Sequence, residues 1–268
     1  MTNLRDKYWI WGHPENCFLG HYNHNVECRM TPMEGALYLG ARNVFMVPNA
    51  NKTVVNVRQY NYSFTTLDHV GWLINHHPEV HDPVLAEAKD FPNVDCMVFD
   101  DFFRIKKNED PVTVEEMHAM HEKLRHHPIR PMDMWMVLYT HEFDDPKCPD
   151  DTVDPYIAAF DGIIMWNWWE SRIGEFEKKY AWFRAHTEGK KRMLGLYVYN
   201  FGENKQATPE IVLWQLNRYS ELLRAGEIDG IVLHTNAMAD CDYPAFRLVH
   251  DWMLEHGDEE LPDLPPRQ

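Results

Sequence analysis

Short apolar runs alternate along the chain with longer segments in which apolar and polar residues recur at helical spacing. Short, nearly continuous apolar runs are typical of strands buried on both faces, and amphipathic segments of about ten residues or more are typical of helices. The predicted strands span residues 8–11, 43–48, 54–64, 95–103, 132–140, 161–169, 192–201 and 229–236.

The predicted helices carry recognisable start signals. Thr31, Pro32 and Glu34 supply an N-cap, a first-turn proline and the partner of a capping box, and Thr113 with Glu116 repeats that box. The predicted helices span residues 31–41, 82–91, 113–127, 154–160, 171–187, 208–227 and 243–257. The helical signals are weakest after the second and third strands.

Alternation of strands and helices predicts parallel strands joined by right-handed crossovers. Eight such units in about 250 residues indicate a single (β/α)8 barrel. We place the barrel at residues 1–258 and a polar, proline-rich tail at residues 259–268. The alternative is a doubly wound open sheet. It is disfavoured because no predicted strand is followed by a glycine-rich phosphate loop, and because the strand starts DGII and DGIV are alike.

Charge and cysteine content narrow the range of partners and compartments. The 268 residues carry a formal net charge of −16 with histidine neutral, which disfavours nucleic acids and anionic membranes as partners. Five cysteines without a CxxC pair predict mostly free thiols and a reducing compartment. No apolar stretch approaches the roughly 20 residues of a membrane span, and the N-terminus has no apolar signal core. We therefore expect a cytoplasmic protein, with a processed exported protein as the alternative.

Polar and aromatic residues gather at the carboxyl ends of the predicted strands, where barrels of this kind hold their sites. Aromatic faces stack on the C–H faces of sugar rings, and Asn, Asp and His bind hydroxyl groups. Few Arg or Lys residues lie there, which disfavours phosphate substrates. We therefore expect a small-molecule or oligosaccharide substrate. The expected substrate-binding residues are Trp11, His13, Tyr60, Tyr139, His141, Trp166, Asn167, Trp168, Trp169, Tyr199, Asn200, His234 and Asn236.

Three carboxylates at strand ends are candidate catalytic groups: Asp100, Asp101 and Glu142. Glycoside hydrolysis needs one protonated acid and a second group that stabilises positive charge at the anomeric carbon. Neighbouring strand residues point to opposite faces, so both aspartates reach the site only if the strand has ended before them. Their proximity would then raise one pKa and keep a proton available. The structural alternatives are that Asp100 caps a turn, that Asp101 pairs with Arg104, and that Glu142 forms a salt bridge.

The pentapeptide VFDDF at residues 98–102 resembles the carboxylate pair of N-acetyl-β-glucosaminidases of the O-GlcNAcase type. In that family the pair follows the fourth barrel strand. The resemblance implies that Asp100 orients the substrate's acetamide, which acts as the nucleophile, and that Asp101 is the general acid. The likeness is local. The Asn-Glu acid motif of larger glycosidase groups is absent after the fourth strand, and Glu203 near the seventh strand lies in a turn.

The tetrapeptide WNWW at residues 166–169 is the strongest binding signal. We expect at least one of Trp166 and Trp168 to pack between the barrel and its helices, and Trp168 or Trp169 to face a ligand. Glu170 follows directly and is interpreted as a first-turn acid of the next helix, where a carboxylate interacts favourably with the helix dipole.

Two other functions fit the same residues. His13, His141, His234 and Glu142 could together bind a divalent metal, as in metal-dependent sugar isomerases, epimerases or hydrolases. No local motif supports a metal, so we predict no cofactor, with a divalent metal as the alternative. Histidines elsewhere are interpreted as mostly surface residues. The other function is a barrel that binds sugar without catalysis. The sequence leaves the identity of the sugar and the oligomeric state open.

Overall fold

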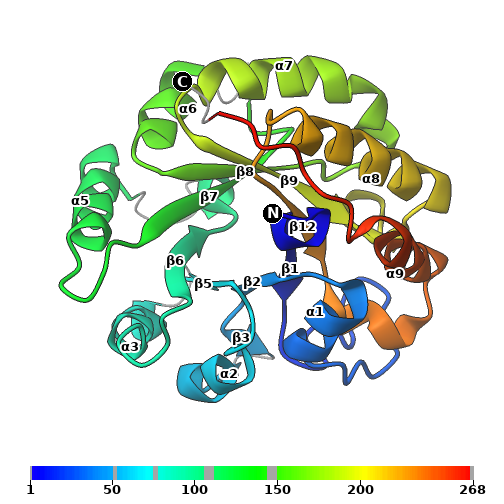
Figure 1. Cartoon of the computed structure of the whole chain (residues 1–268), viewed down its shortest axis with the longest axis horizontal. Coiled ribbons are helices and arrows are strands. Elements are labelled where there is room, and N and C mark those ends of the chain that lie inside the picture. The colour runs from blue at the N-terminus through cyan, green and yellow to red at the C-terminus, as the bar shows by residue number, and fades with distance from the viewer. Residues whose placement is uncertain (1, 51–52, 75–77, 106–111, 144–149, 266–268) are drawn as a thin grey trace.

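Eight parallel strands close into a barrel in the order β1-β12-β9-β8-β7-β6-β5-β2, and helices surround it (Figure 1). This computed structural model describes residues 2–50, 53–74, 78–105, 112–143 and 150–265. The barrel strands are β1 (Tyr8–Gly12), β2 (Asn43–Met46), β5 (His69–Leu73), β6 (Val94–Phe99), β7 (Asp133–Tyr139), β8 (Gly162–Trp166), β9 (Lys191–Tyr197) and β12 (Gly230–His234). The predicted (β/α)8 barrel is therefore confirmed.

Nine α-helices and four short 3-10 helices connect the strands within the described part of the chain. The α-helices are α1 (Pro32–Leu39), α2 (Val57–Ser63), α3 (Pro78–Glu87), α4 (Phe102–Ile105), α5 (Val114–Arg125), α6 (Asp150–Ala158), α7 (Phe176–His186), α8 (Pro209–Arg224) and α9 (Pro244–His256). The 3-10 helices are η1 (Leu4–Lys7), η2 (Glu170–Glu175), η3 (Phe201–Glu203) and η4 (Asn236–Cys241). Two hairpins lie outside the barrel: β3 (Asn49–Ala50) with β4 (Thr53–Val54), and β10 (Tyr199–Asn200) with β11 (Lys205–Gln206).

The predicted third strand is wrong. The sequence predicts a strand at residues 54–64, but Val57–Ser63 forms helix α2, and the third barrel strand is β5. The side chain of Asn56 caps α2 by accepting a backbone hydrogen bond of 3.1 Å. Valine and tyrosine favour strands only weakly and according to context, and here an N-cap overrides them. Tyr60 therefore lies on a helix rather than at a strand end.

Several other boundaries differ from prediction, and the strands predicted to end at residues 103 and 169 end at Phe99 and Trp166. Strand β9 ends at Tyr197, and Tyr199–Asn200 turns away to pair with β11 instead of extending the barrel. The helix predicted at residues 171–187 begins as the 3-10 turn η2 and becomes α-helical only at Phe176. Helix α3 begins at Pro78, before its predicted start at residue 82.

Large aromatic side chains fill the barrel interior opposite glycines on neighbouring strands. A Cβ atom on Gly195 of β9 would lie 2.0 Å from Cδ2 of Trp166 on β8. A Cβ atom on Gly162 of β8 would likewise lie 2.4 Å from Cε3 of Trp135 on β7. Each glycine thus makes room for an indole from the adjacent strand, because close packing leaves no space for both side chains. Trp166 is held in this way at the carboxyl end of the barrel.

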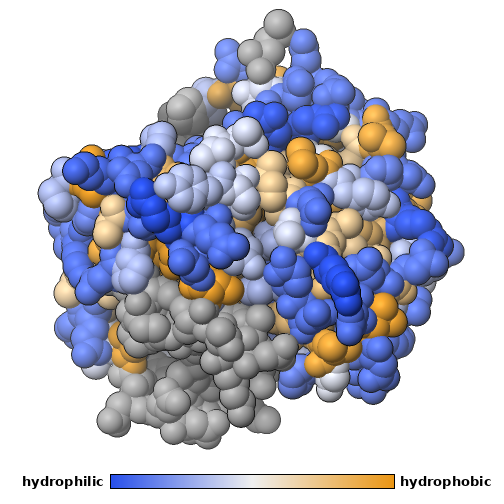
Figure 2. All heavy atoms as spheres, turned by 90° about the horizontal axis from the view of Figure 1, so that it is seen from below, coloured by the Kyte–Doolittle hydropathy of each residue, from blue (hydrophilic) through white to orange (hydrophobic). Residues whose placement is uncertain are grey.

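The first and last described segments of the chain meet at the opposite end of the barrel. The Leu4 amide donates to the Glu259 carbonyl and the Leu261 amide donates to the Thr2 carbonyl, each at 2.9 Å. The first residues of the predicted tail therefore pair with the N-terminal segment, which lies near the centre of the ring in Figure 1. The face seen in Figure 2 is mostly hydrophilic, with apolar residues in small groups. Among the described residues no helix is both long and apolar enough to cross a membrane.

Candidate active site

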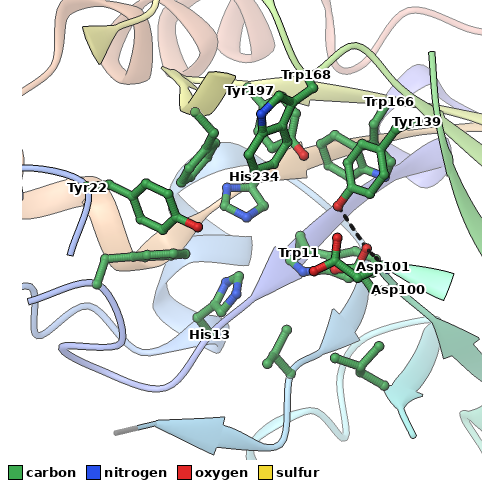
Figure 3. A pocket seen from close by; sticks show the side chains of 14 residues that line it. Trp11, His13, Tyr22, Asp100, Asp101, Tyr139, Trp166, Trp168, Tyr197 and His234 are labelled. Carbon is green, nitrogen blue, oxygen red and sulfur yellow. Dashed lines mark hydrogen bonds between the residues drawn. The ribbon is translucent and has the colours of Figure 1, made fainter. Parts of the chain in front are cut away.

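A cavity of about 140 Å³ lies at the carboxyl end of the barrel (Figure 3). All eight barrel strands contribute to it, either by their last residues or by the residue that follows. It is lined by Trp11, His13, Phe18, Tyr22, Val47, Leu73, Asp100, Asp101, Tyr139, Trp166, Trp168, Tyr197, Phe201 and His234. An apolar cavity of roughly 150 Å³ holds one benzene ring, so this cavity has room for a single six-membered ring.

Both aspartates of the pair line the cavity. Strand β6 ends at Phe99, so strand alternation no longer sends Asp100 and Asp101 to opposite faces. Asp101 adopts a left-handed backbone conformation with φ 51°, which aspartate tolerates better than most residues. In Figure 3 the two carboxylates lie on one side of the cavity and Tyr22 on the other. The side chain of Arg104, the predicted alternative partner of Asp101, lies outside the described residues.

Two donors fix the orientation of the Asp100 carboxylate. The Tyr139 hydroxyl donates to Oδ1 at 2.9 Å, and the Asp101 amide donates to the same oxygen at 2.7 Å. Burial raises the pKa of Tyr139 well above its ordinary value, and the nearby charge of Asp100 raises it further. The hydroxyl therefore keeps its proton, and Asp100 is held as an acceptor.

Two neutral imidazoles form a second polar feature of the cavity. The rings of His13 and His234 have centroids 5.1 Å apart. Burial lowers the pKa of His13 to about 3 and lowers that of His234 well below its ordinary value. Both side chains are more than nine-tenths buried, and Nδ1 of His234 has no hydrogen-bond partner among the described residues. Neither ring therefore carries a charge near neutral pH.

The surroundings of His13 select one tautomer. The Thr235 hydroxyl lies 2.6 Å from the Trp11 carbonyl oxygen, to which it donates, and 2.9 Å from Nδ1 of His13. Because the hydroxyl has a single proton, Nδ1 must donate to Thr235 Oγ1, which leaves Nε2 as an acceptor. Asn236 fixes the same loop, since its side chain bonds the amide and the carbonyl of His13 at 2.9 Å each.

Aromatic side chains form the remaining walls. Trp168 stacks on Phe201 with ring centroids 5.6 Å apart and an interplanar angle of 27°. Tyr197 lies against Trp166 at 4.5 Å. Phe18 extends the same surface and contacts Phe201 at 5.7 Å. Aromatic side chains and the two carboxylates therefore both border the cavity.

Eight of the residues predicted for the site therefore meet at the cavity: Trp11, His13, Asp100, Asp101, Tyr139, Trp166, Trp168 and His234. The others do not line it. Glu142 is buried, and its Oε2 accepts the Tyr139 amide at 3.0 Å, so this carboxylate caps its own turn. Tyr60 donates to Glu15 at 3.2 Å from helix α2.

The other predicted residues organise the loops around the cavity. Asn167 accepts from Thr140 at 3.1 Å and donates to the Trp169 carbonyl at 2.8 Å, which fixes the turn after β8. Trp169 turns away from the cavity, with the Arg172 guanidinium 4.6 Å from its ring and the His141 ring at 4.6 Å.

Two residues of the β10 hairpin have similar roles. The Tyr199 hydroxyl lies 2.7 Å from the Tyr22 carbonyl oxygen and 2.9 Å from Oδ1 of Asn204. Asn200 caps η3 by accepting the Glu203 amide at 3.2 Å. These side chains bond the surrounding loops and do not line the cavity.

Sequence reasoning missed six lining residues: Phe18, Tyr22, Val47, Leu73, Tyr197 and Phe201. The sequence pattern could have predicted Tyr197, because it alternates with Met193 and Gly195 along β9 and therefore shares their inward face. The strand prediction ran past Tyr197 and drew attention to Tyr199 instead. Phe18 and Tyr22 lie in the long connection after β1, where no periodicity marks them.

The residues proposed for a metal site are not brought together. His13 and His234 line the cavity, whereas Glu142 and His141 do not. Within the described ranges, no three His, Cys, Asp or Glu side chains are grouped in a way that could hold a metal ion.

The chain matches no protein-family model and no curated protein. Solved structures share its fold. The tryptophan synthase A-subunit from Pyrococcus furiosus is 13% identical with a TM-score of 0.54, over 93% of this chain and 97% of that one. A xylanase-alpha-amylase inhibitor protein solved with trehalose is 10% identical with a TM-score of 0.55, over 92% and 98%. At such low identity the likeness establishes the barrel alone.

Proposed function

We propose that this barrel is a glycoside hydrolase that binds one terminal sugar ring and cleaves the bond to the next group. The observation that carries the proposal is the Asp100–Asp101 pair, which faces an aromatic cavity at the carboxyl end of the barrel. Barrel enzymes place their chemistry at that end, and most glycosidases use two carboxyl groups. The size of the cavity favours a single ring.

The contacts of the pair suggest different roles for its members. Asp100 accepts two hydrogen bonds at Oδ1, so it is held as an oriented carboxylate that can stabilise positive charge. Asp101 borders the cavity from a left-handed turn, and we assign it the general acid that protonates the leaving oxygen. Glu142 does not reach the cavity, so it does not supply a nucleophile there.

A substrate that carries its own nucleophile fits this arrangement. In substrate-assisted hydrolysis the acetamide oxygen of an N-acetyl sugar attacks the anomeric carbon in place of an enzyme carboxylate. Asp100 would orient the acetamide nitrogen, as the resemblance of VFDDF to O-GlcNAcase-type enzymes implies. N-acetyl-β-glucosaminides are therefore the first substrates to test.

The histidines and aromatics supply recognition. Nε2 of His13 is an acceptor, so it can accept a hydrogen bond from a hydroxyl group of the sugar. Trp168 lines the cavity and would supply an aromatic contact to the C–H side of the ring. Both contacts are neutral, which suits an uncharged sugar.

The test is a screen of aryl glycosides with wild-type protein and three variants. Asp101→Asn should lower kcat by roughly 10²–10⁴, the usual contribution of positioned proton transfer. The loss should shrink for substrates with acidic leaving groups, which need little protonation. Asp100→Asn should lower kcat without that dependence. Glu142→Gln, a buried carboxylate outside the cavity, is the matched control and should keep turnover. Unchanged turnover in a folded Asp101→Asn variant would remove the proposed role.

Binding of sugar without hydrolysis is the second candidate. The position of Glu142 favours this function, because Glu142 lies outside the cavity. The cavity therefore lacks the third carboxylate that was predicted to take part in hydrolysis. Titration calorimetry with the sugars of the same panel distinguishes the two functions. Saturable binding by wild-type protein with no product from any glycoside would select the binding function.

A further inference from the structure

The connection between β1 and α1 forms one side of the candidate site. We call residues 14–30 the strap. It contributes Phe18 and Tyr22 to the cavity. Its two ends are joined, because the Asn16 amide donates to the Cys28 carbonyl at 2.8 Å and the Cys28 amide donates to Oδ1 of Asn16 at 2.9 Å. The strap is therefore a closed loop laid over the barrel opening.

Several polar contacts of the strap go to the segment after β12. The Arg29 amide donates to Oδ2 of Asp240 at 2.7 Å. The side chain of His24 meets the Tyr243 hydroxyl, with 2.7 Å between Nδ1 and the oxygen. The contact of Arg29 is exposed, whereas His24 is buried and packs against the Tyr199 ring, with centroids 4.4 Å apart. These contacts tie this wall of the cavity to helix η4 and to the start of helix α9.

Two cysteines face each other across this junction. Sγ of Cys28, on the strap, lies 3.5 Å from Sγ of Cys241, the last residue of η4. A disulfide needs a sulfur separation of about 2.05 Å, so a shift of an ångström or two closes the gap. Cys28 is buried and Cys241 is only half-buried. His24 also faces the pair, with Nδ1 3.9 Å from the Cys241 sulfur.

We propose that Cys28 and Cys241 are a redox modification site, at which a reversible disulfide locks the strap over the cavity. The oxidant is a small-molecule disulfide of the glutathione type. The thiolate of Cys241 attacks it, forms a mixed disulfide and releases one glutathione thiolate. The Cys28 sulfur then displaces the second glutathione and loses its proton to solvent. Two protein thiols are oxidised to one disulfide, and one glutathione disulfide is reduced to two thiols.

The order of attack follows from exposure. Burial raises the pKa of Cys28 to about 12, with the neighbouring Cys241 adding to the effect, so Cys28 is mostly protonated and shielded from the reagent. Cys241 is the accessible partner. Once it carries glutathione, the sulfur of Cys28 is already adjacent, and the second step is intramolecular.

The locked form should be more rigid and more stable than the reduced form. The bridge would join residues 213 positions apart and restrict the unfolded chain, which raises Tm by roughly 5–15 °C for a domain of this size. It should also slow amide exchange in residues 14–30, because opening of the strap would require reduction. These effects do not depend on which ligand the cavity binds.

The experiment titrates the folded protein with mixtures of reduced and oxidised glutathione. Alkylation, intact mass and non-reducing peptide mapping should find a Cys28–Cys241 peptide, and hydrogen–deuterium exchange should show protection of the strap in the bridged form. Cys28→Ser should trap glutathione on Cys241, whereas Cys241→Ser should leave Cys28 unmodified. Cys17→Ser, a thiol on the same strap, is the control and should still form the bridge.

Two results would overturn the proposal. The first is wild-type protein that keeps glutathione on Cys241, or stays unmodified, at oxidant levels that fully oxidise a reference dithiol. The second is a bridge that forms without any change in the exchange of the strap.

Discussion

Replacing His13 by Asn should reduce the loss of stability that the protein suffers in mild acid. The folded state holds the imidazole neutral, with a pKa of about 3 against an ordinary value of 6.5, because the ring is buried. The unfolded chain takes up a proton below about pH 6.5 and the folded chain does not. The free energy of unfolding is therefore highest above pH 6.5 and falls as the pH drops from 6.5 toward 3.

The size of the effect follows from linkage. Each pH unit below 6.5 costs about 1.4 kcal/mol for one such group, so His13 alone should cost about 2 kcal/mol at pH 5. Burial also lowers the pKa of His234, so that ring adds a loss of the same sign. The two contributions are independent as long as both rings stay neutral in the folded state.

The assay is urea denaturation at pH 7 and pH 5. An asparagine amide can still donate to Thr235 Oγ1, the contact that Nδ1 of His13 makes now. The pH 7 to pH 5 loss in His13→Asn should be about 2 kcal/mol smaller than in wild-type protein. His21→Asn, which removes an exposed strap imidazole, is the control. An equal loss of unfolding free energy between pH 7 and pH 5 in wild-type protein and His13→Asn would show that His13 is not held neutral. An NMR titration of the ring would measure its protonation directly.

Two further predictions concern the aromatic residues of the barrel. Gly195→Ala should lower the free energy of unfolding by about 1–3 kcal/mol through overpacking against Trp166. Gly174→Ala is the control, because no atom lies within 4 Å of the new Cβ, and it should be nearly neutral in the same thermal melts. Equal melting temperatures of the two variants would contradict this packing. Trp168→Ala should raise KM roughly two- to tenfold through loss of one aromatic contact, and Trp169→Ala should leave KM unchanged. A higher KM in Trp169→Ala with an unchanged KM in Trp168→Ala would show that Trp169, and not Trp168, contacts the substrate.

Strand prediction succeeded where burial on both faces produces continuous apolar runs. The runs at residues 132–140 and 229–236 became β7 and β12 because parallel barrel strands are covered on the inside and the outside. It failed at residues 54–64, where Asn56 caps a helix, and it missed β5. The β5 run is short and contains Gly71, whose missing side chain makes room for Phe45 of β2, a contact that no local pattern reveals.

The position of a residue at a strand end predicted many of the residues that line the cavity. It did not predict whether a side chain faces the cavity or bonds the backbone. Glu142 and Asn236 stand at strand ends like Asp100, yet their side chains bond backbone groups, Glu142 in its own turn and Asn236 in the connection after β1. Buried backbone donors and acceptors need partners, so polar side chains at a rim are divided between structure and ligand. Whether a given polar side chain bonds the backbone or faces the cavity depends on the final turn of its loop.

The sequence by itself determined the barrel and the placing of an aspartate pair at the end of its fourth strand. The apolar pattern and the succession of strands and helices along the chain can both be recognised without the tertiary structure. Only the tertiary structure decided the shape of the cavity. Phe18 and Tyr22 reach it through a strap in which Tyr22 and Cys28 contact residues 177 and 213 positions away. Such contacts form when distant segments meet, and loop residues show no repeating pattern that would predict them.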